Sequence, residues 1–233
     1  MSHNSEDMVH LMHLLQLSDS ALPVGMFSFS AGLESAVTEG LVFDLTTLRS
    51  FVYDAVERSL HSDCIIALAA HRASRSGDYD RMRHINELSE LTLLSDERRL
   101  MSHRMGRKLL QLATEITRHH SIVAWADAVN RSEVTPSLAA TQGVIFAAVG
   151  IGEREMTSSL LYSAASMILG AALRLMRISH IDTQRILYAI GSESGELFDR
   201  IADSDIDDVC AFTPQTDLCN SLHERGSNRM FMS

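Results

Sequence analysis

Histidine and methionine are the residue types in this chain that could bind a metal, with 11 His and 12 Met in 233 residues. His10 and His13 could share one face of a helix, whereas the adjacent His119 and His120 would point about 100° apart. A protein metal site normally needs three or four convergent ligands. The methionines recur with other apolar residues at helical spacing, which is typical of core packing. The spacing therefore predicts no stable metal site and no tightly bound cofactor.

Serine and carboxylate side chains do not form a catalytic pattern either. Ser28 and Ser30 lack the Gly-x-Ser-x-Gly context of a nucleophile elbow. The sequence contains no Gly-x-x-x-x-Gly-Lys-Ser/Thr phosphate loop. Glu193 and Glu196 are neighbours on one predicted helix face, where we interpret them as solvated charges. The residues alone predict no active site.

The composition limits the partners and the compartment. The formal net charge of −10 argues against a nucleic-acid surface, although a basic protein partner would be acceptable. Cys64, Cys210 and Cys219 lack paired spacing, which favours a reducing, cytoplasmic location. No signal-peptide pattern is visible at the N-terminus. Residues 156–173 carry no charge, but their serine and threonine content favours a buried helix over a membrane span.

Apolar residues recur at helical spacing along nearly the whole chain, which predicts an all-α fold in one multi-helix bundle. The two most apolar segments, 137–151 and 156–175, are predicted as central helices, with the charged triplet 153–155 in the turn between them. We expect an all-helical domain over 1–203. Residues 204–233 lack a helical period and are predicted to be an irregular tail, flexible when unbound.

Helix boundaries follow from capping residues. Asp44 and Ser95 are predicted N-caps, and Gly77 is a predicted helix end. We expect a break near His61 and a last long helix capped by Asp182.

Residues 14–37 contain a Pro and two Gly in a short turn between apolar runs. This segment, LLQLSDSALPVGMFSFSAGLESAV, resembles the N-terminal signature of the UreF family of urease accessory proteins. Pro23, Gly25 and Gly32 would keep the shape of the turn. The resemblance implies that Glu34, in the Gly-Leu-Glu motif, belongs to the surface that engages the GTPase UreG.

Two further segments resemble the same family. Glu97 and Arg99 match its Glu-x-Arg motif, and Gly106 inside this helix predicts a close helix crossing. Arg174 matches an Ala-x-Arg/Lys-Leu motif and Asp182 also matches, so the resemblance implies a GTPase-facing role for these residues. Residues 177–180, Arg-Ile-Ser-His, depart from the usual Pro-aliphatic-Gly-Gln.

The C-terminal tail resembles the family ending Pro-x-x-Asp-(Ile/Leu) … His-Glu … Arg-Leu-Phe-x-Ser. The resemblance implies that the tail binds UreD, also called UreH, and becomes ordered there. We expect that deleting residues 214–233 hardly changes the melting temperature of the isolated chain. The residues of the tail that match the family are Asp217, His223, Glu224, Arg229 and Phe231.

The resemblance implies a homodimeric, non-enzymatic scaffold that bridges UreG to UreD/UreH and modulates GTP hydrolysis. Nickel would pass through or beside this complex to apo-urease. Two alternatives stay open: a histidine-based nickel-binding or storage protein, and a cofactor-free enzyme with acids scattered through its loops. Titration with Ni²⁺ would separate the first alternative from the scaffold.

Overall fold

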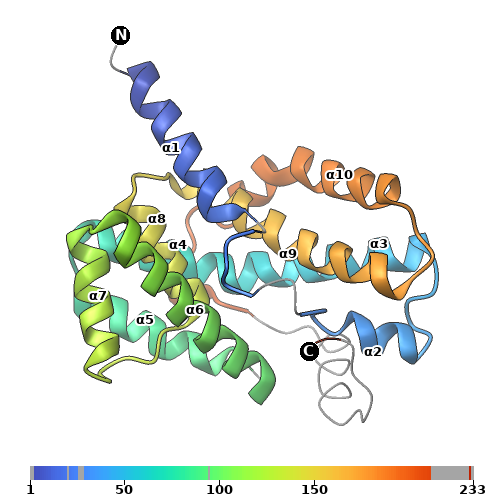
Figure 1. Cartoon of the computed structure of the whole chain (residues 1–233), viewed down its shortest axis with the longest axis horizontal. Helices are drawn as coiled ribbons and strands as arrows, with labels where there is room; N and C mark the ends of the chain where they lie inside the picture. The colour runs from blue at the N-terminus through green and yellow to red at the C-terminus, as the bar shows by residue number, and fades with distance from the viewer. Residues whose placement is uncertain (1–2, 20, 26–28, 94, 211–230, 232–233) are drawn as a thin grey trace.

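The computed structural model describes residues 3–19, 21–25, 29–93, 95–210 and 231. Every regular element within these residues is a helix, so the predicted all-α fold is confirmed (Figure 1). The α-helices are α1 His3–Ser18, α2 Leu33–Thr38, α3 Leu45–Ser59, α4 Ile65–Ser76, α5 Tyr79–Leu91, α6 Asp96–Thr117, α7 His120–Asn130, α8 Leu138–Ala148, α9 Glu153–Leu175 and α10 His180–Asp199. A π-helix covers Leu60–Cys64, and a 3₁₀-helix covers Ile206–Asp208.

Capping side chains set several helix ends where the sequence predicts them. The carboxylate of Asp44 accepts a hydrogen bond from the Thr47 amide at 2.8 Å, and the Thr47 hydroxyl accepts one from the Asp44 amide at 3.0 Å. Ser95 begins α6 by accepting from the Arg98 amide at 3.2 Å. Gly77 ends α4 with a φ of 72°, a conformation that glycine adopts easily.

The predicted break near His61 is wrong, because α3 runs through the π-helix into α4. A π-turn changes the hydrogen-bonding register of a helix locally. The carbonyl of His61, inside this turn, accepts a hydrogen bond from the Cys210 amide at 2.9 Å. The irregular turn therefore fixes the chain at residue 210 against the middle of a continuous helix.

Two apolar cores divide the molecule. The first lies mainly among α2, α3, α9 and α10, and the second lies among α4–α8, on the left in Figure 1. Leu60 and Cys64 of the continuous helix belong to the first core, whereas Ile66 and Ala69 belong to the second. One helical segment is therefore shared by both cores.

The two most apolar segments form α8 and α9, but the charged triplet 153–155 is the first turn of α9 rather than the predicted connecting turn. Acidic side chains are favoured there because the N-terminal end of a helix carries partial positive charge. Glu153 also pairs with Arg72 of α4 at 2.6 Å. The connection is made instead by residues 149–152, where Gly150 has a φ of 80°.

Among the described helices, α9 is long and apolar enough to cross a membrane by length and composition. Of its most apolar window, 56% is buried inside the fold. The core helix of a soluble protein meets the same criterion, so this finding is weak evidence for a membrane span.

Two glycines allow close backbone approaches around α8. A Cβ on Gly106 of α6 would lie 2.9 Å from the carbonyl oxygen of Pro136, which confirms a close crossing there, at the residues before α8. A Cβ on Gly143 of α8 would lie only 2.3 Å from the carbonyl oxygen of Ala67 on α4. Neither position has room for a side chain, so α8 lies directly against α4 and α6.

Candidate functional site

The turn that precedes α2 is built from the N-terminal motif. Gly25 and Gly32 have φ values of 92° and 84°, in the left-handed region that favours glycine. Pro23 lies in a turn between them and α1, where the Leu22 amide donates to the Asp19 carbonyl at 3.0 Å. Gly32 is the N-cap residue of α2, so the turn determines where the first residues of that helix lie.

Glu34 lies in the first turn of α2 and is half-buried. One of its carboxylate oxygens, Oε2, accepts a hydrogen bond from the backbone amide of Phe231 at 3.1 Å. The two residues are far apart in the sequence, so this contact brings residue 231 to the N-terminal motif.

Arg174 contacts the same residue from α9. Its guanidinium carbon lies 4.1 Å from the centre of the Phe231 ring, within the range of a cation–π interaction. Its Nε donates to the carbonyl of Gly170 at 3.4 Å. The Phe231 side chain is 5% exposed and belongs to the first core. We refer to Glu34, Arg174 and Phe231 as the C-terminal clasp.

Glu97 and Arg99 lie at the start of α6, a helix that contributes no residue to the clasp. The Arg99 guanidinium donates to the Asp96 carboxylate at 2.6 Å and also to the Leu93 carbonyl. Glu97 is in the first turn, where negative charge is favoured. Arg99 therefore holds the connection between α5 and α6, a role that its match to the family did not indicate.

The sequence predicts Asp182 as the N-cap of α10, which is wrong because Ser179 takes that position. Asp182 is the third residue of the helix, and its Oδ2 accepts from the Ser179 hydroxyl at 2.6 Å and from the Ser179 amide at 3.2 Å. These hydrogen bonds, that from the hydroxyl first, lower the pKa of the Asp182 carboxyl. The pattern Ser-x-x-Asp is a capping box that could have been recognised in the sequence.

Of the predicted tail residues, Phe231 is described by the structure. Asp217, His223, Glu224 and Arg229 lie outside the described residues. The described part of the tail begins with a 3₁₀-helix whose Ile206 is buried in the second core. The domain boundary at residues 203 and 204 stays a prediction.

The histidines of the described residues do not converge on a common metal position. Among the described residues, no group of three or more His, Cys, Asp or Glu could hold a metal ion. The rings of His119 and His120 lie 4.4 Å apart between centroids. Partial burial and the neighbouring His120 lower the pKa of His119, which disfavours a positive charge on His119.

In the described residues this is an all-helical protein in which motifs from distant parts of the sequence meet around the buried side chain of Phe231. A sequence model of the UreF family matches residues 42–191. The chain belongs to the UreF family of urease accessory proteins.

Relatives support this assignment over almost the whole chain. The chain is 41% identical over 223 residues to urease accessory protein UreF 1 of Brucella melitensis biotype 1, covering 96% of this chain and 92% of the relative. The values are the same for urease accessory protein UreF 2 of Brucella canis. Identity to urease accessory protein UreF of Yersinia enterocolitica serotype O:8 is 36% over 228 residues, 98% of this chain and 99% of the relative.

Proposed function

We propose that this chain is a urease maturation factor that bridges the GTPase UreG to UreD/UreH during nickel delivery to apo-urease. In this proposal the chain acts in the cytoplasm as a non-enzymatic scaffold and modulates GTP hydrolysis by its partner. Nickel is the cargo of the complex rather than a cofactor of this subunit. Membership of the UreF family over nearly the full chain supports the proposal.

The observation that carries the proposal is the C-terminal clasp. Glu34 and Arg174 are the charges assigned to the GTPase-facing surface, and Phe231 belongs to the tail assigned to UreD/UreH. Glu34 and Arg174 both contact Phe231, the first through the hydrogen bond of 3.1 Å to its amide and the second through its ring at 4.1 Å. A partner that moves the tail would therefore change the position and charge environment of both GTPase-facing residues. Such a link would let one partner modulate the other through this chain.

Glu97, Arg99 and Asp182 extend the proposed GTPase surface. Arg99 and Asp182 both have structural partners in the isolated chain. Their replacement would therefore disturb a helix start as well as any partner contact. Arg174 also contacts Phe231, but its exposed side chain lies at the end of α9 and caps no helix start, so it is the better test of partner binding.

The proposal is tested by co-purification of the full chain with the UreG and UreD/UreH proteins, comparing the natural sequence with Arg174→Ala. We expect the variant to retain UreD/UreH but to recover less than about one tenth of the GTPase. Arg107→Ala, an exposed residue of α6, is the matched control. Normal GTPase recovery with Arg174→Ala, together with full urease activation, would contradict the assignment.

A nickel-storage role predicts a different result in titration calorimetry. Tight, stoichiometric Ni²⁺ binding to the isolated chain would favour storage. Weak binding beyond one equivalent would favour the scaffold, because dispersed histidines bind metal weakly.

We also propose that the chain is a homodimer. The buried residues of α8 are used within the chain, whereas α9 has partly exposed positions near its C-terminal half. A stable two-fold interface should bury more than roughly 1,000 Å² in total. Light scattering at micromolar concentration should give about twice 25.8 kDa. A strict monomer that still binds both partners would exclude the dimeric form of the scaffold.

A further inference from the structure

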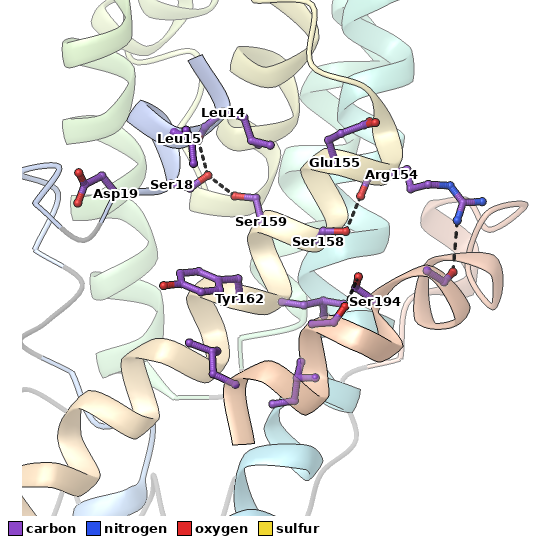
Figure 2. A pocket seen from close by; sticks show the side chains of 15 residues that line it. Leu14, Leu15, Ser18, Asp19, Arg154, Glu155, Ser158, Ser159, Tyr162 and Ser194 are labelled. Carbon is purple, nitrogen blue, oxygen red and sulfur yellow. Dashed lines mark hydrogen bonds between the residues drawn. The ribbon is translucent and has the colours of Figure 1, made fainter. Parts of the chain in front are cut away.

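A groove of about 740 Å³ lies between α1, α9 and α10, apart from the clasp residues (Figure 2). Its wall on α1 includes Leu14 and Leu15, and Tyr162 of α9 lies at its edge. Leu187 and Ile190 line it from α10. Most of the exposed surface of the lining is apolar, as in grooves that receive an apolar helix face, although four serines also line it.

The apolar surface continues across α10. Tyr162, Leu187 and Gly191 line both this groove and a neighbouring shallow depression that reaches Ile181 and Tyr188. Tyr188 is 81% exposed, and Ile181 is 64% exposed. Between Ile181 and Gly195, α10 spans about 21 Å at 1.5 Å per residue. This length would accommodate a helix of roughly 14 residues.

Helix α1 adds a second apolar strip to the same face. It projects from the body of the molecule in Figure 1. Near its C-terminal end it is fixed by a hydrogen bond of 2.6 Å between the Ser18 and Ser159 hydroxyls. Met8, Leu11, Met12 and Leu15 are each more than half exposed, at positions i, i+3, i+4 and i+7. Such spacing is typical of one helix packing along another.

The charges around the groove are mainly acidic. Asp19 and Glu155 are exposed on its lining, and no ion pair to either is found among the described residues. The basic residue of the lining, Arg154, is already paired with Asp199 at 2.6 Å and stacks on Phe198 at 4.6 Å. Arg185, on the lining of the neighbouring depression, lies 3.8 Å from the Asp182 carboxylate. Because both arginines face carboxylates, Asp19 and Glu155 give the rim a negative charge, in keeping with the net charge of −10 for the chain.

We propose that this groove binds a basic amphipathic helix of a partner protein. The apolar face of that helix would pack on Leu15, Tyr162 and Tyr188, and its lysine or arginine side chains would face Asp19 and Glu155. A second copy of this chain would bring the same acidic rim against itself, and an anionic lipid surface would be repelled by it. The proposal does not depend on the clasp or on the assignment of the GTPase surface.

The test measures binding of a fluorescein-labelled, 14-residue helical peptide of leucine and lysine to the full chain by fluorescence anisotropy. The double variant Leu15→Lys with Tyr188→Lys should weaken binding at least tenfold, because Leu15 is an exposed side chain of the groove and Tyr188 is an exposed side chain of the depression beside it. Ile116→Lys, at a 52% exposed position on α6, is the matched control and should bind within twofold of the natural sequence. A peptide with glutamate in place of lysine should bind at least tenfold more weakly.

Several results would overturn the proposal. They are equal binding of the lysine and glutamate peptides, unchanged binding by the double variant, and no binding of the lysine peptide up to 1 millimolar. Conversion of a dimer to a monomer by the double variant in light scattering would assign the groove to a second copy instead. Loss of co-sedimentation with phosphatidylserine vesicles in the double variant alone would assign it to a membrane. Protection of α1, α9 and α10 from hydrogen exchange by the lysine peptide would support the proposal.

Discussion

Phe231 is held by two side chains that differ in what they recognise. The Glu34 carboxylate binds the backbone amide, which any residue other than proline would offer, whereas the Arg174 guanidinium binds the face of the aromatic ring. The sequence identified each of the three residues through a separate motif. It could not show that they meet, because neither helical period nor motif spacing relates residue 34 to residue 231.

Replacing Glu34 separates its structural role from its proposed partner role. Glu34→Ala removes the acceptor for the Phe231 amide and should lower the free energy of unfolding by about 1 kcal/mol. Glu34→Gln keeps an acceptor without the charge, so it should retain most of that stability but still weaken GTPase binding. Urea unfolding of both variants measures the stability, and a pull-down measures GTPase binding. Glu115→Ala, at an exposed position, is the control for both measurements. Full GTPase binding by Glu34→Gln would mean that the charge is structural.

A buried histidine should make the stability depend on pH. His71 is fully buried, and its Nε2–H donates to the Ile151 carbonyl at 2.8 Å. Burial lowers the pKa of His71 below its ordinary value of 6.5, and its Nδ1 has no hydrogen-bond partner among the described residues. As the pH falls below 6.5, the unfolded chain binds a proton that the folded chain resists. The stability contributed by this residue is therefore present above pH 6.5 and decreases below it.

We expect the natural sequence to lose more of its free energy of unfolding than His71→Gln between pH 7.5 and pH 5.5. Glutamine can still donate to the Ile151 carbonyl, so the variant removes the titration while keeping a donor. Urea unfolding of both proteins at the two pH values measures the difference. Equal losses would show that His71 does not control this part of the pH dependence.

Most helices could be predicted from the sequence because their apolar periods and capping residues are local signals. Asp44 and Ser95 act as predicted. The N-cap of α10 was predicted three residues too late, at Asp182 instead of Ser179, because a capping box contains two polar residues that can each resemble the N-cap. The π-helix at Leu60–Cys64 could not be predicted, since its extra residue is accommodated by tertiary contacts such as that from Cys210.

Close contact between α4 and α8 should make Gly143 intolerant of substitution. Gly143→Ala would place a Cβ 2.3 Å from the Ala67 carbonyl oxygen, so the helices must separate, at a cost of about 3 kcal/mol. Gly170→Ala is the matched control, because a Cβ there meets nothing within 4 Å. The control should stabilise the chain by about 0.5–1 kcal/mol through helix propensity. Urea unfolding measures both, and equal effects would show that the crossing can relax.

The burial of Phe231 changes the expectation for the tail. The absence of a helical period predicted that its removal would hardly matter. Burial of Phe231 in the first core now indicates a contribution to the stability of the isolated chain. A single aromatic anchor has no period, so sequence pattern could not reveal it.

Phe231→Ala should lower the free energy of unfolding by about 3 kcal/mol, from lost apolar burial and the lost ring contact. For a chain of this size, the melting temperature should fall by roughly 6–12 °C. Phe43→Ala is the matched control, because Phe43 is 71% exposed. Calorimetry of the two variants gives the comparison. An unchanged melting temperature for Phe231→Ala would mean that the tail adds its stability in the complex alone.

The division into two cores also gives the molecule an internal optical probe. The single tryptophan, Trp125, is buried in the second core, whereas the clasp belongs to the first, and the continuous helix from α3 to α4 is shared by both. Emission from Trp125 therefore reports the packing of the half of the protein that does not contain Phe231. A shift of the Trp125 emission maximum when a partner binds the C-terminal tail would show that binding also changes the packing of the second core. This measurement needs no added label.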